Sequence, residues 1–133
     1  MKNHSKTKST FFLLAIATIF LVFSCSKDDE AAKANFIGTY DVTETCDDSN
    51  NSYVISITAV GTDGNSIQIY NLWDWEEYAT ATVSGSTISI PNQILDAVTF
   101  SGSGTLSDKT LTLNYTAIDD DGIENCRAIC VKK

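Results

Sequence analysis

The chain has 133 residues, of which 43% are hydrophobic and 20% charged, and its formal net charge is −8 at pH 7. This acidic balance argues against a nucleic-acid partner, because phosphates require basic contacts. The single histidine, His4, stands four residues from the start. The rest of the chain therefore offers no Ser-His or Cys-His catalytic pair and no histidine ligand for a metal, and we predict no cofactor and no metal site.

The N-terminus has the pattern of a secretion signal. Three lysines precede an uncharged run, Phe11–Phe23. Thirteen residues make about 20 Å of helix, which is too short for a hydrocarbon core of roughly 30 Å and suits the central region of a signal peptide. We therefore predict a cleaved signal peptide over residues 1–24. Its removal takes away the three lysines and no acid, and the remaining 109 residues carry a net charge of −11.

Ser24 and Cys25 resemble the lipobox of bacterial lipoproteins, in which a small residue precedes a cysteine that is acylated through its sulfur. Val22 and Phe23 depart from the usual residues before the cysteine, as in the relaxed lipobox of Bacteroidetes lipoproteins. In that group a lysine and acidic residues after the cysteine form a surface-export signal, and residues 27–30 fit it. The resemblance implies an outer-membrane protein anchored through lipid on Cys25 and exposed at the cell surface. One acyl chain binds membranes only marginally, so the anchor requires more than one.

Residues 25–35 are charged or small and show no apolar period. We predict an acylated cysteine followed by a flexible acidic tether. The alternative, a short helix through residues 31–34, would have almost nothing to pack against.

From Phe36 onward, polar and apolar residues alternate with a period of two between turn signals, which predicts strands. Eight are expected, over residues 37–46, 52–60, 66–72, 78–84, 86–91, 97–106, 110–117 and 125–132. Pro91 should end the fifth strand, and the glycines of segment 101–104 should bend or bulge the sixth. The large apolar side chains of two strands should face inward: Tyr53, Ile55 and Ile57, and Leu111, Leu113 and Tyr115.

Short connections favour an antiparallel up-and-down meander, and closing it into a barrel removes the unpaired edges. Closure makes the first and last strands neighbours, so Cys46 at the end of one meets Cys126 at the start of the other. We predict a Cys46–Cys126 disulfide, with Cys130 a buried free thiol near Val42. A Cys126–Cys130 bridge, awkward in a strand where residues four apart lie about 13 Å apart, and three free thiols are the alternatives. Either would argue against closure.

Three segments resemble the small lipocalin-like domains of Bacteroidetes lipoproteins: residues 36–40, 110–116 and 126–130. Lipocalins proper have Gly-x-Trp where this chain has Gly38-Thr39-Tyr40, and their last-strand arginine packs over that tryptophan. Arg127 is on the expected strand but should point away from Tyr40. The resemblance covers residues 36–133 and implies an all-β, lipocalin-like barrel that acts as a binding or interaction module. An eight-stranded interior is either filled by side chains or holds one small apolar ligand.

Trp73, Trp75 and Tyr78 lie close together in the sequence beside Asp74, Glu76 and Glu77. Aromatic faces stack on sugar rings and carboxylates bond hydroxyls, so this loop is a candidate glycan site. Alternatively, one tryptophan closes the barrel end and the other packs on a neighbouring loop.

Paired carboxylates suffice for glycoside hydrolysis, but no pair in this sequence is marked as buried. A glycan-processing enzyme would need a recessed acid with a raised pKa near the tryptophan loop. The run Asp119–Gly122 lacks the alternate ligand spacing of calcium loops, which leaves a solvated turn as the default and a weak surface calcium site as the alternative. We therefore predict a non-enzymatic protein.

Overall fold

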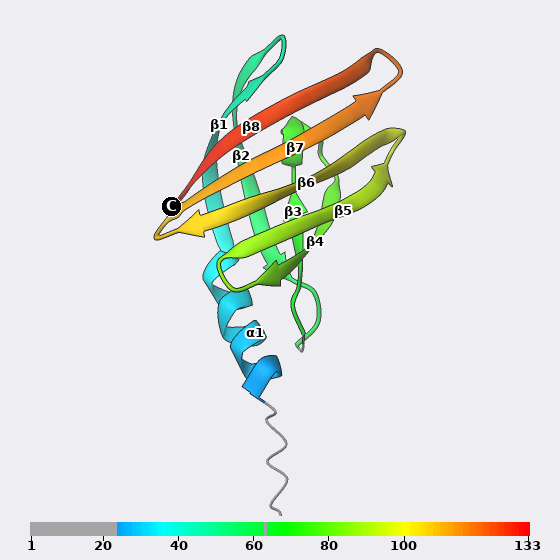
Figure 1. Cartoon of the computed structure of the whole chain (residues 1–133). Helices are drawn as coiled ribbons and strands as arrows, with labels where there is room; N and C mark the ends of the chain where they lie inside the picture. The colour runs from blue at the N-terminus through cyan, green and yellow to red at the C-terminus, as the bar shows by residue number, and fades with distance from the viewer. Residues whose placement is uncertain (1–23, 63) are drawn as a thin grey trace, which may run out of the picture.

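The computed structural model describes residues 24–62 and 64–133 (Figure 1). The elements in chain order are α1 (Ser24–Phe36), β1 (Gly38–Cys46), β2 (Asn50–Ala59), β3 (Ser66–Tyr70), the 3-10 helix η1 (Leu72–Asp74), β4 (Tyr78–Ser84), β5 (Thr87–Leu95), β6 (Val98–Ser107), β7 (Thr110–Asp119) and β8 (Gly122–Lys132). The predicted signal peptide, residues 1–24, lies outside the described residues except for Ser24, and the side chain of Cys25 lies outside them as well. Within the described part of the chain, no helix is both long and apolar enough to cross a membrane.

The strands form a closed antiparallel barrel in which each strand pairs with the next and β8 pairs with β1. This confirms the predicted all-β, up-and-down meander. In the closing ladder Cys46 lies opposite Cys126, and Val42 lies opposite Cys130. Because strand direction alternates, successive connections lie at opposite ends of the barrel. One end, which we call the α1 end, has α1 and the β4–β5 and β6–β7 turns. The β1–β2 loop, η1 and the β5–β6 and β7–β8 turns share the other, which we call the η1 end (Figure 1).

The barrel interior is filled by the inward residues that the alternation predicted. Ile55, Ile57, Leu111 and Leu113 are buried, Tyr115 is nearly so, and Tyr53 is half-buried. The alternating burial pattern is clearest along β4, where every second residue is buried. One apolar core therefore runs through the barrel.

The irregular position predicted for the sixth strand lies instead on its neighbour. β6 keeps an unbroken register with β7 through segment 101–104. The β5–β6 register shifts between Ile90 and Gln93, so β5 carries the bulge and continues past Pro91 to Leu95. Pro91 thus marks a bulge, which spares it a ladder hydrogen bond, and does not end the strand. The missing Cβ of Gly102 has a packing role, because a Cβ there would lie 2.5 Å from Cβ of Tyr115.

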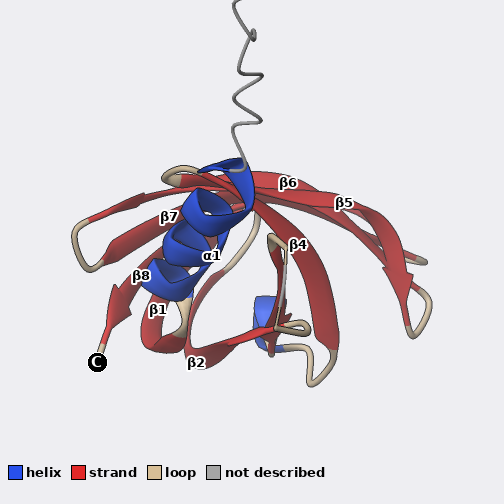
Figure 2. Cartoon of the chain, turned by 90° about the horizontal axis from the view of Figure 1, so that it is seen from below, coloured by secondary structure: helices blue, strands red, loops and turns tan. Residues whose placement is uncertain are grey.

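The segment predicted to be a flexible tether, residues 25–35, is instead helical and makes up most of α1, which packs against the barrel (Figure 2). Phe36 is fully buried and Ala32 packs against the core. The last-turn carbonyls also find donors: the Tyr40 hydroxyl donates to the Phe36 oxygen at 2.8 Å, and Lys132 Nζ donates to the Asn35 oxygen at 2.9 Å. Tertiary contacts therefore stabilise a helix of good helix formers that would be marginal on its own.

Candidate functional site

A disulfide joins Cys46 and Cys126 at the η1 end, with 4.0 Å between the Cα atoms. This confirms the predicted pairing, and Cys130 is the buried free thiol that was expected. Arg127 is exposed on the outer face, as its register predicted, while Tyr40 is buried. The bridge ties the first strand to the last at the end where the other candidate residues gather.

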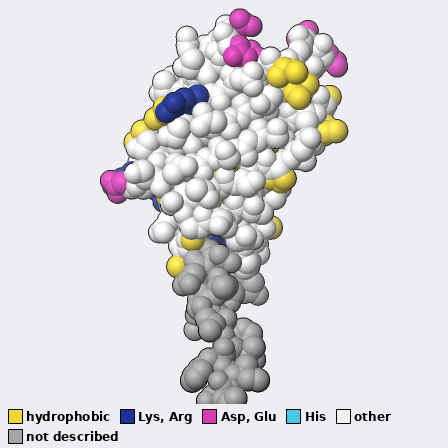
Figure 3. Space-filling view, viewed as in Figure 1, with side chains coloured by type: hydrophobic (Ala, Val, Ile, Leu, Met, Phe, Trp, Pro, Cys, Tyr) yellow, Lys and Arg dark blue, Asp and Glu magenta, His cyan; other side chains and the backbone are white. Residues whose placement is uncertain are grey.

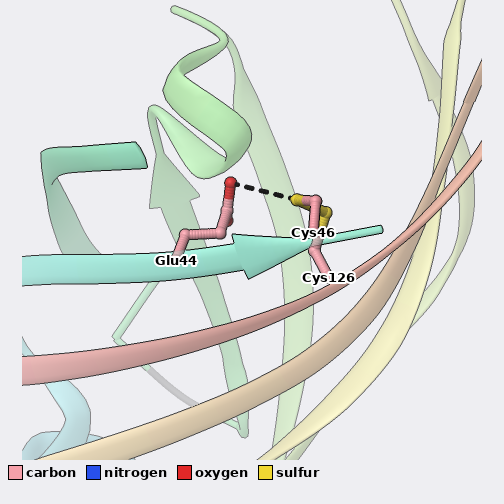
Figure 4. A group of neighbouring side chains, drawn as sticks. All are labelled: Glu44, Cys46 and Cys126. Carbon is pink, nitrogen blue, oxygen red and sulfur yellow. Dashed lines mark hydrogen bonds between the residues drawn. A yellow bond between two sulfur atoms is a disulfide. The ribbon is translucent and has the colours of Figure 1, made fainter. Parts of the chain in front are cut away.

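A buried carboxyl group lies directly beside this disulfide (Figure 4). Glu44 has no exposed surface. Its Oε2 accepts hydrogen bonds from the Tyr53 hydroxyl, at 2.5 Å, and from the Tyr115 hydroxyl. Its Oε1 lies 3.5 Å from Sγ of Cys46. A disulfide sulfur has no proton, so any hydrogen bond here runs from a protonated Glu44 to the sulfur, which is a weak acceptor.

Burial raises the pKa of Glu44, because the charged form loses its solvation. The hydrogen bonds from Tyr115 and Tyr53 lower this pKa in part, and the charge of Glu124 raises it further. Burial also raises the pKa of both tyrosines, so their hydroxyls stay protonated and act as donors. The cluster is therefore a hydrogen-bonded group at the η1 end of the apolar core, in which burial favours the protonated form of Glu44.

Glu44 was not among the predicted site residues, although the sequence pattern of β1 indicates that it is buried. On β1 the inward positions are Tyr40, Val42, Glu44 and Cys46, so the same alternation that placed Cys46 inside also places Glu44 inside. The donor atoms of Glu44, Cys46 and Cys126 lie within 4.8 Å of one another, as in a metal site. Both sulfurs are in the disulfide and are not available as thiolates, so one carboxylate remains and a metal site is not supported.

The 3-10 helix η1 lies over the Glu44 cluster. The Trp73 backbone amide donates to the Tyr53 hydroxyl at 3.0 Å, and Leu72 is buried in the core. Asn71, Trp73 and Asp74 all have positive φ, a conformation that costs free energy in residues other than glycine. The Asn71 side chain fixes this turn by donating to the Val54 carbonyl at 2.9 Å and to Asp74 Oδ1 at 3.3 Å.

The structure brings together two of the three aromatic residues predicted as a site. The ring centroids of Trp73 and Trp75 lie 6.1 Å apart, with 48° between the planes. Tyr78 faces outward on β4 and packs on Tyr70 at 4.8 Å. The two indole planes are tilted, so they do not form a single flat platform.

Both tryptophans are half-buried, and each indole N–H has a partner. Trp73 donates to Glu124 Oε2 at 3.0 Å and Trp75 donates to the Leu95 carbonyl at 3.2 Å. The Trp73 ring also meets Phe100 of the core edge to face, at 5.9 Å. Each indole therefore helps to close the barrel and leaves part of its surface to solvent.

Three surface grooves surround these indoles. The first has a volume of about 390 Å³ and is lined by Ser49, Asn51, Trp73, Asp74, Trp75 and Glu124. The second, of about 430 Å³, runs from Asp74 to Glu77 and reaches Asp96. The third, of about 250 Å³, lies between Trp73 and the β7–β8 turn. The first groove, which we call the tryptophan groove, is the one that both indoles line together with amide, hydroxyl and carboxylate groups.

Charge is distributed unequally between the two ends of the barrel. The carboxyl groups at the η1 end are those of Glu44, Asp47, Asp48, Asp74, Glu76, Glu77, Asp96, Asp119, Asp120, Asp121 and Glu124. The lysines of the described side chains, Lys33, Lys109, Lys132 and Lys133, are all at the α1 end, where three acids accompany them. Figure 3 shows most of the visible acidic side chains at the end furthest from α1. The η1 end is therefore strongly acidic and the α1 end nearly neutral.

Two further cavities lie away from this site. A cavity of about 710 Å³ separates α1 from the β4–β5 and β6–β7 turns. A cavity of about 500 Å³ lies along the strands that flank the disulfide, and Arg127 is part of its lining. The described cavities thus lie at the ends and the wall of the barrel, around an interior occupied by side chains.

No family model and no curated protein matches the sequence. Among solved structures, the chain is similar to a redesigned β-barrel, with a TM-score of 0.56 and 15% identity, over 77% of this chain and 95% of that chain. Zebrafish ileal bile acid-binding protein complexed with cholic acid has a TM-score of 0.42 and 13% identity, over 74% of this chain and 99% of that one. At these identities the likeness concerns the fold alone, and the first of these structures supports a small closed β-barrel.

Proposed function

We propose that the protein is a non-enzymatic binding module, held at the outer membrane by an acylated Cys25 and exposed at the cell surface, that binds a small polar ligand in the tryptophan groove. The observation that carries the binding proposal is the groove itself. Its volume of about 390 Å³ is within the range of small-molecule sites, and its lining combines aromatic surface with a few converging polar groups.

The proposed anchoring agrees with where the two ends of the barrel lie. Cys25 precedes the part of α1 that packs on the barrel, so a lipid there would hold the α1 end at the bilayer. The acidic η1 end would then face away from the membrane. The tryptophan groove would be open to ligands from outside.

Replacement of Cys25 by alanine tests the anchor. The variant should move from the membrane fraction to the soluble fraction, and retention in the membrane would disprove lipidation at this residue. Protease treatment of whole cells tests exposure separately. Protection from the protease would place the anchored protein on the periplasmic side.

The groove is a better candidate than the barrel interior. Side chains as large as Phe100, Ile55 and Leu113 fill the interior and have no exposed surface. Phe36 closes one end, and Leu72 of η1 occupies the other. A small apolar ligand could enter only by displacing these residues, at the free-energy cost of opening a close-packed core.

Glycan binding is the second candidate function, and the pair of indoles favours it. Trp73 and Trp75 present partly exposed rings 6.1 Å apart, beside Glu124 and Asp74. A tilt of 48° suits two sugar rings at an angle, or one sugar held between an indole and a carboxylate, better than a flat chain on both rings. Tyr78 lies outside this arrangement.

Glu44 meets the description of the recessed acid that a glycan-processing enzyme would need. Its pKa is raised and it contacts Tyr53, which in turn bonds η1. Its carboxyl group is nevertheless fully buried and held by two tyrosine hydroxyls, so a bound substrate could not reach it without rearrangement. We propose a structural role for Glu44, and binding without turnover.

A glycan array followed by titration of intrinsic tryptophan fluorescence tests the binding proposal. The ligand should quench the fluorescence, and Trp75→Ala should abolish binding. Tyr78→Ala, which removes an exposed ring on the outer wall, is the matched control and should bind as the wild type does. Equal loss in both variants would refute the tryptophan groove. Release of a cleaved product would refute the non-enzymatic assignment.

A further inference from the structure

A row of exposed isoleucines crosses the outer wall of the barrel at the η1 end. Ile94 on β5 lies opposite Thr99 on β6, Thr99 lies opposite Ile118 on β7, and Ile118 lies opposite Ile123 on β8. Residues directly opposite in antiparallel strands point to the same face, so all four side chains share the outer surface. With strands about 4.8 Å apart, the row is about 14 Å wide. We call it the isoleucine row.

These side chains are unusually exposed for their type. Ile94 is 71% exposed and Ile123 63%, the highest values among the large hydrophobic residues of the described chain. Ile118 is 38% exposed. Single exposed apolar residues are common, but here three lie in one row across four strands, interrupted only by Thr99, and together form an apolar strip. Figure 3 shows hydrophobic side chains gathered next to acidic ones at this end of the molecule.

Acids border the row on the side of the two turns. Asp96 lies two residues after Ile94, in the β5–β6 turn, and Asp119, Asp120 and Asp121 lie between Ile118 and Ile123. The nearest basic residue along β8 is Arg127, four positions beyond Ile123 and thus about 13 Å away. An apolar strip with an acidic border complements an apolar face bordered by lysine or arginine.

The same features argue against two other occupants. A second copy of this chain would bring its own acidic turns against these, and like charges oppose such a contact. Anionic lipid headgroups would repel the border as well.

We infer that the isoleucine row is a docking site for a cationic amphipathic segment of another protein. The isoleucines bury against the apolar face of the segment, and the acids at the turns pair with its basic residues. Opposite charges raise the rate of association and fix the orientation of the segment. The inference does not rest on ligand binding in the tryptophan groove, which lies at the mouth of the barrel and has a different lining.

Surface plasmon resonance with the full chain captured through its C-terminus tests this, because the C-terminus lies at the α1 end and leaves the row free. The probe is a synthetic peptide of about 15 residues, with leucines on one helical face and lysines on the other. It should bind, and the double variant Ile94→Thr with Ile123→Thr should weaken binding at least tenfold. Val131→Thr, which alters an exposed residue of β8 near the α1 end, should leave binding unchanged.

Charge and location have separate controls. Raising the salt concentration should weaken peptide binding, and a peptide with glutamates in place of its lysines should not bind. Trp75→Ala should bind the peptide normally, so failure of the groove proposal and failure of this one are distinguishable. The inference is overturned if the lysine peptide does not bind, if the double variant binds it equally well, or if the glutamate peptide binds as tightly. Concentration-dependent dimers lost in the double variant would instead assign the row to a second copy.

Discussion

Removal of the disulfide should strongly destabilise the protein while leaving the hydrogen-bond ladders intact. The bridge joins residues 80 apart in sequence. Closing a loop of that length restricts the unfolded chain by about 4.5 kcal/mol at 25 °C on the chain-entropy model. The double variant Cys46→Ala with Cys126→Ala keeps the pairing of β1 with β8 but loses this term. Small domains have about 5–15 kcal/mol of stability, so the variant should fold with little to spare.

Guanidinium unfolding at neutral pH measures this loss. With a denaturant slope of about 3 kcal/mol/M, a change of about 4.5 kcal/mol lowers the midpoint by about 1.5 M. Cys130→Ala is the matched control, because it removes a buried sulfur from the same strand and leaves the bridge in place. Its loss of packing, about 1 kcal/mol, should lower the midpoint by about 0.3 M. A double variant no less stable than this control would refute the argument from loop closure.

Three further changes test the interior. Burial raises the pKa of Glu44 in the folded protein, so its carboxyl group stays protonated to higher pH than in the unfolded chain. The free energy of unfolding should therefore fall as the pH rises above about 4.3, the ordinary carboxyl pKa. Denaturant titrations at several pH values should show that Glu44→Gln lacks this part of the pH dependence of stability. A variant whose stability depends on pH as the wild type's does would contradict the prediction. Burial raises the pKa of Cys130 to about 12, so iodoacetamide should modify it only after unfolding, and rapid modification of the native protein would contradict its place in the core. Gly102→Ala should cost about 1–3 kcal/mol, because the new Cβ meets Tyr115, whereas Ser101→Ala should be nearly neutral in thermal unfolding.

The strands could be predicted because their signal is local, and their closure could be predicted from their number and order. Alternation with a period of two identifies both the strand and its buried face, as in β7, where Leu111, Leu113 and Tyr115 are all inside. Once the strands are assigned as a closed meander, the register that places Cys46 opposite Cys126 follows from topology. The disulfide was therefore predictable without any long-range information beyond the strand count.

Features that depend on contacts between distant segments could not be predicted in this way. Residues 30–35 are good helix formers, but so short a helix is marginal alone. Its place on the barrel is set by distant contacts, because Phe36 fits the barrel end and because Tyr40 and Lys132 satisfy its last carbonyls. Likewise, the positive φ values of η1 depend on Asn71 reaching Val54, which is 17 residues away in sequence. Such conformations are set by tertiary structure, which overrides local propensity.

The candidate site was only half predictable for a related reason. Sequence proximity grouped Trp73, Trp75 and Tyr78, but Tyr78 is the first residue of β4 and its register with Tyr70 turns it to the outer wall. Glu124, which is 51 residues from Trp73, takes its place beside the indoles. A site formed by loops at a barrel end combines residues from several strands, and spacing along one segment cannot identify them.

The alternation that fills the barrel also explains why both proposed binding surfaces lie at the η1 end. Every large inward side chain of β2 and β7 is used in packing, so the interior offers a ligand no free surface. On β8 the same alternation directs Glu124 inward to Trp73 and Ile123 outward to the isoleucine row. Adjacent residues therefore supply the tryptophan groove and the outer wall, on opposite faces of one strand. A ligand in the tryptophan groove and a segment docked on the isoleucine row would therefore contact opposite faces of β8.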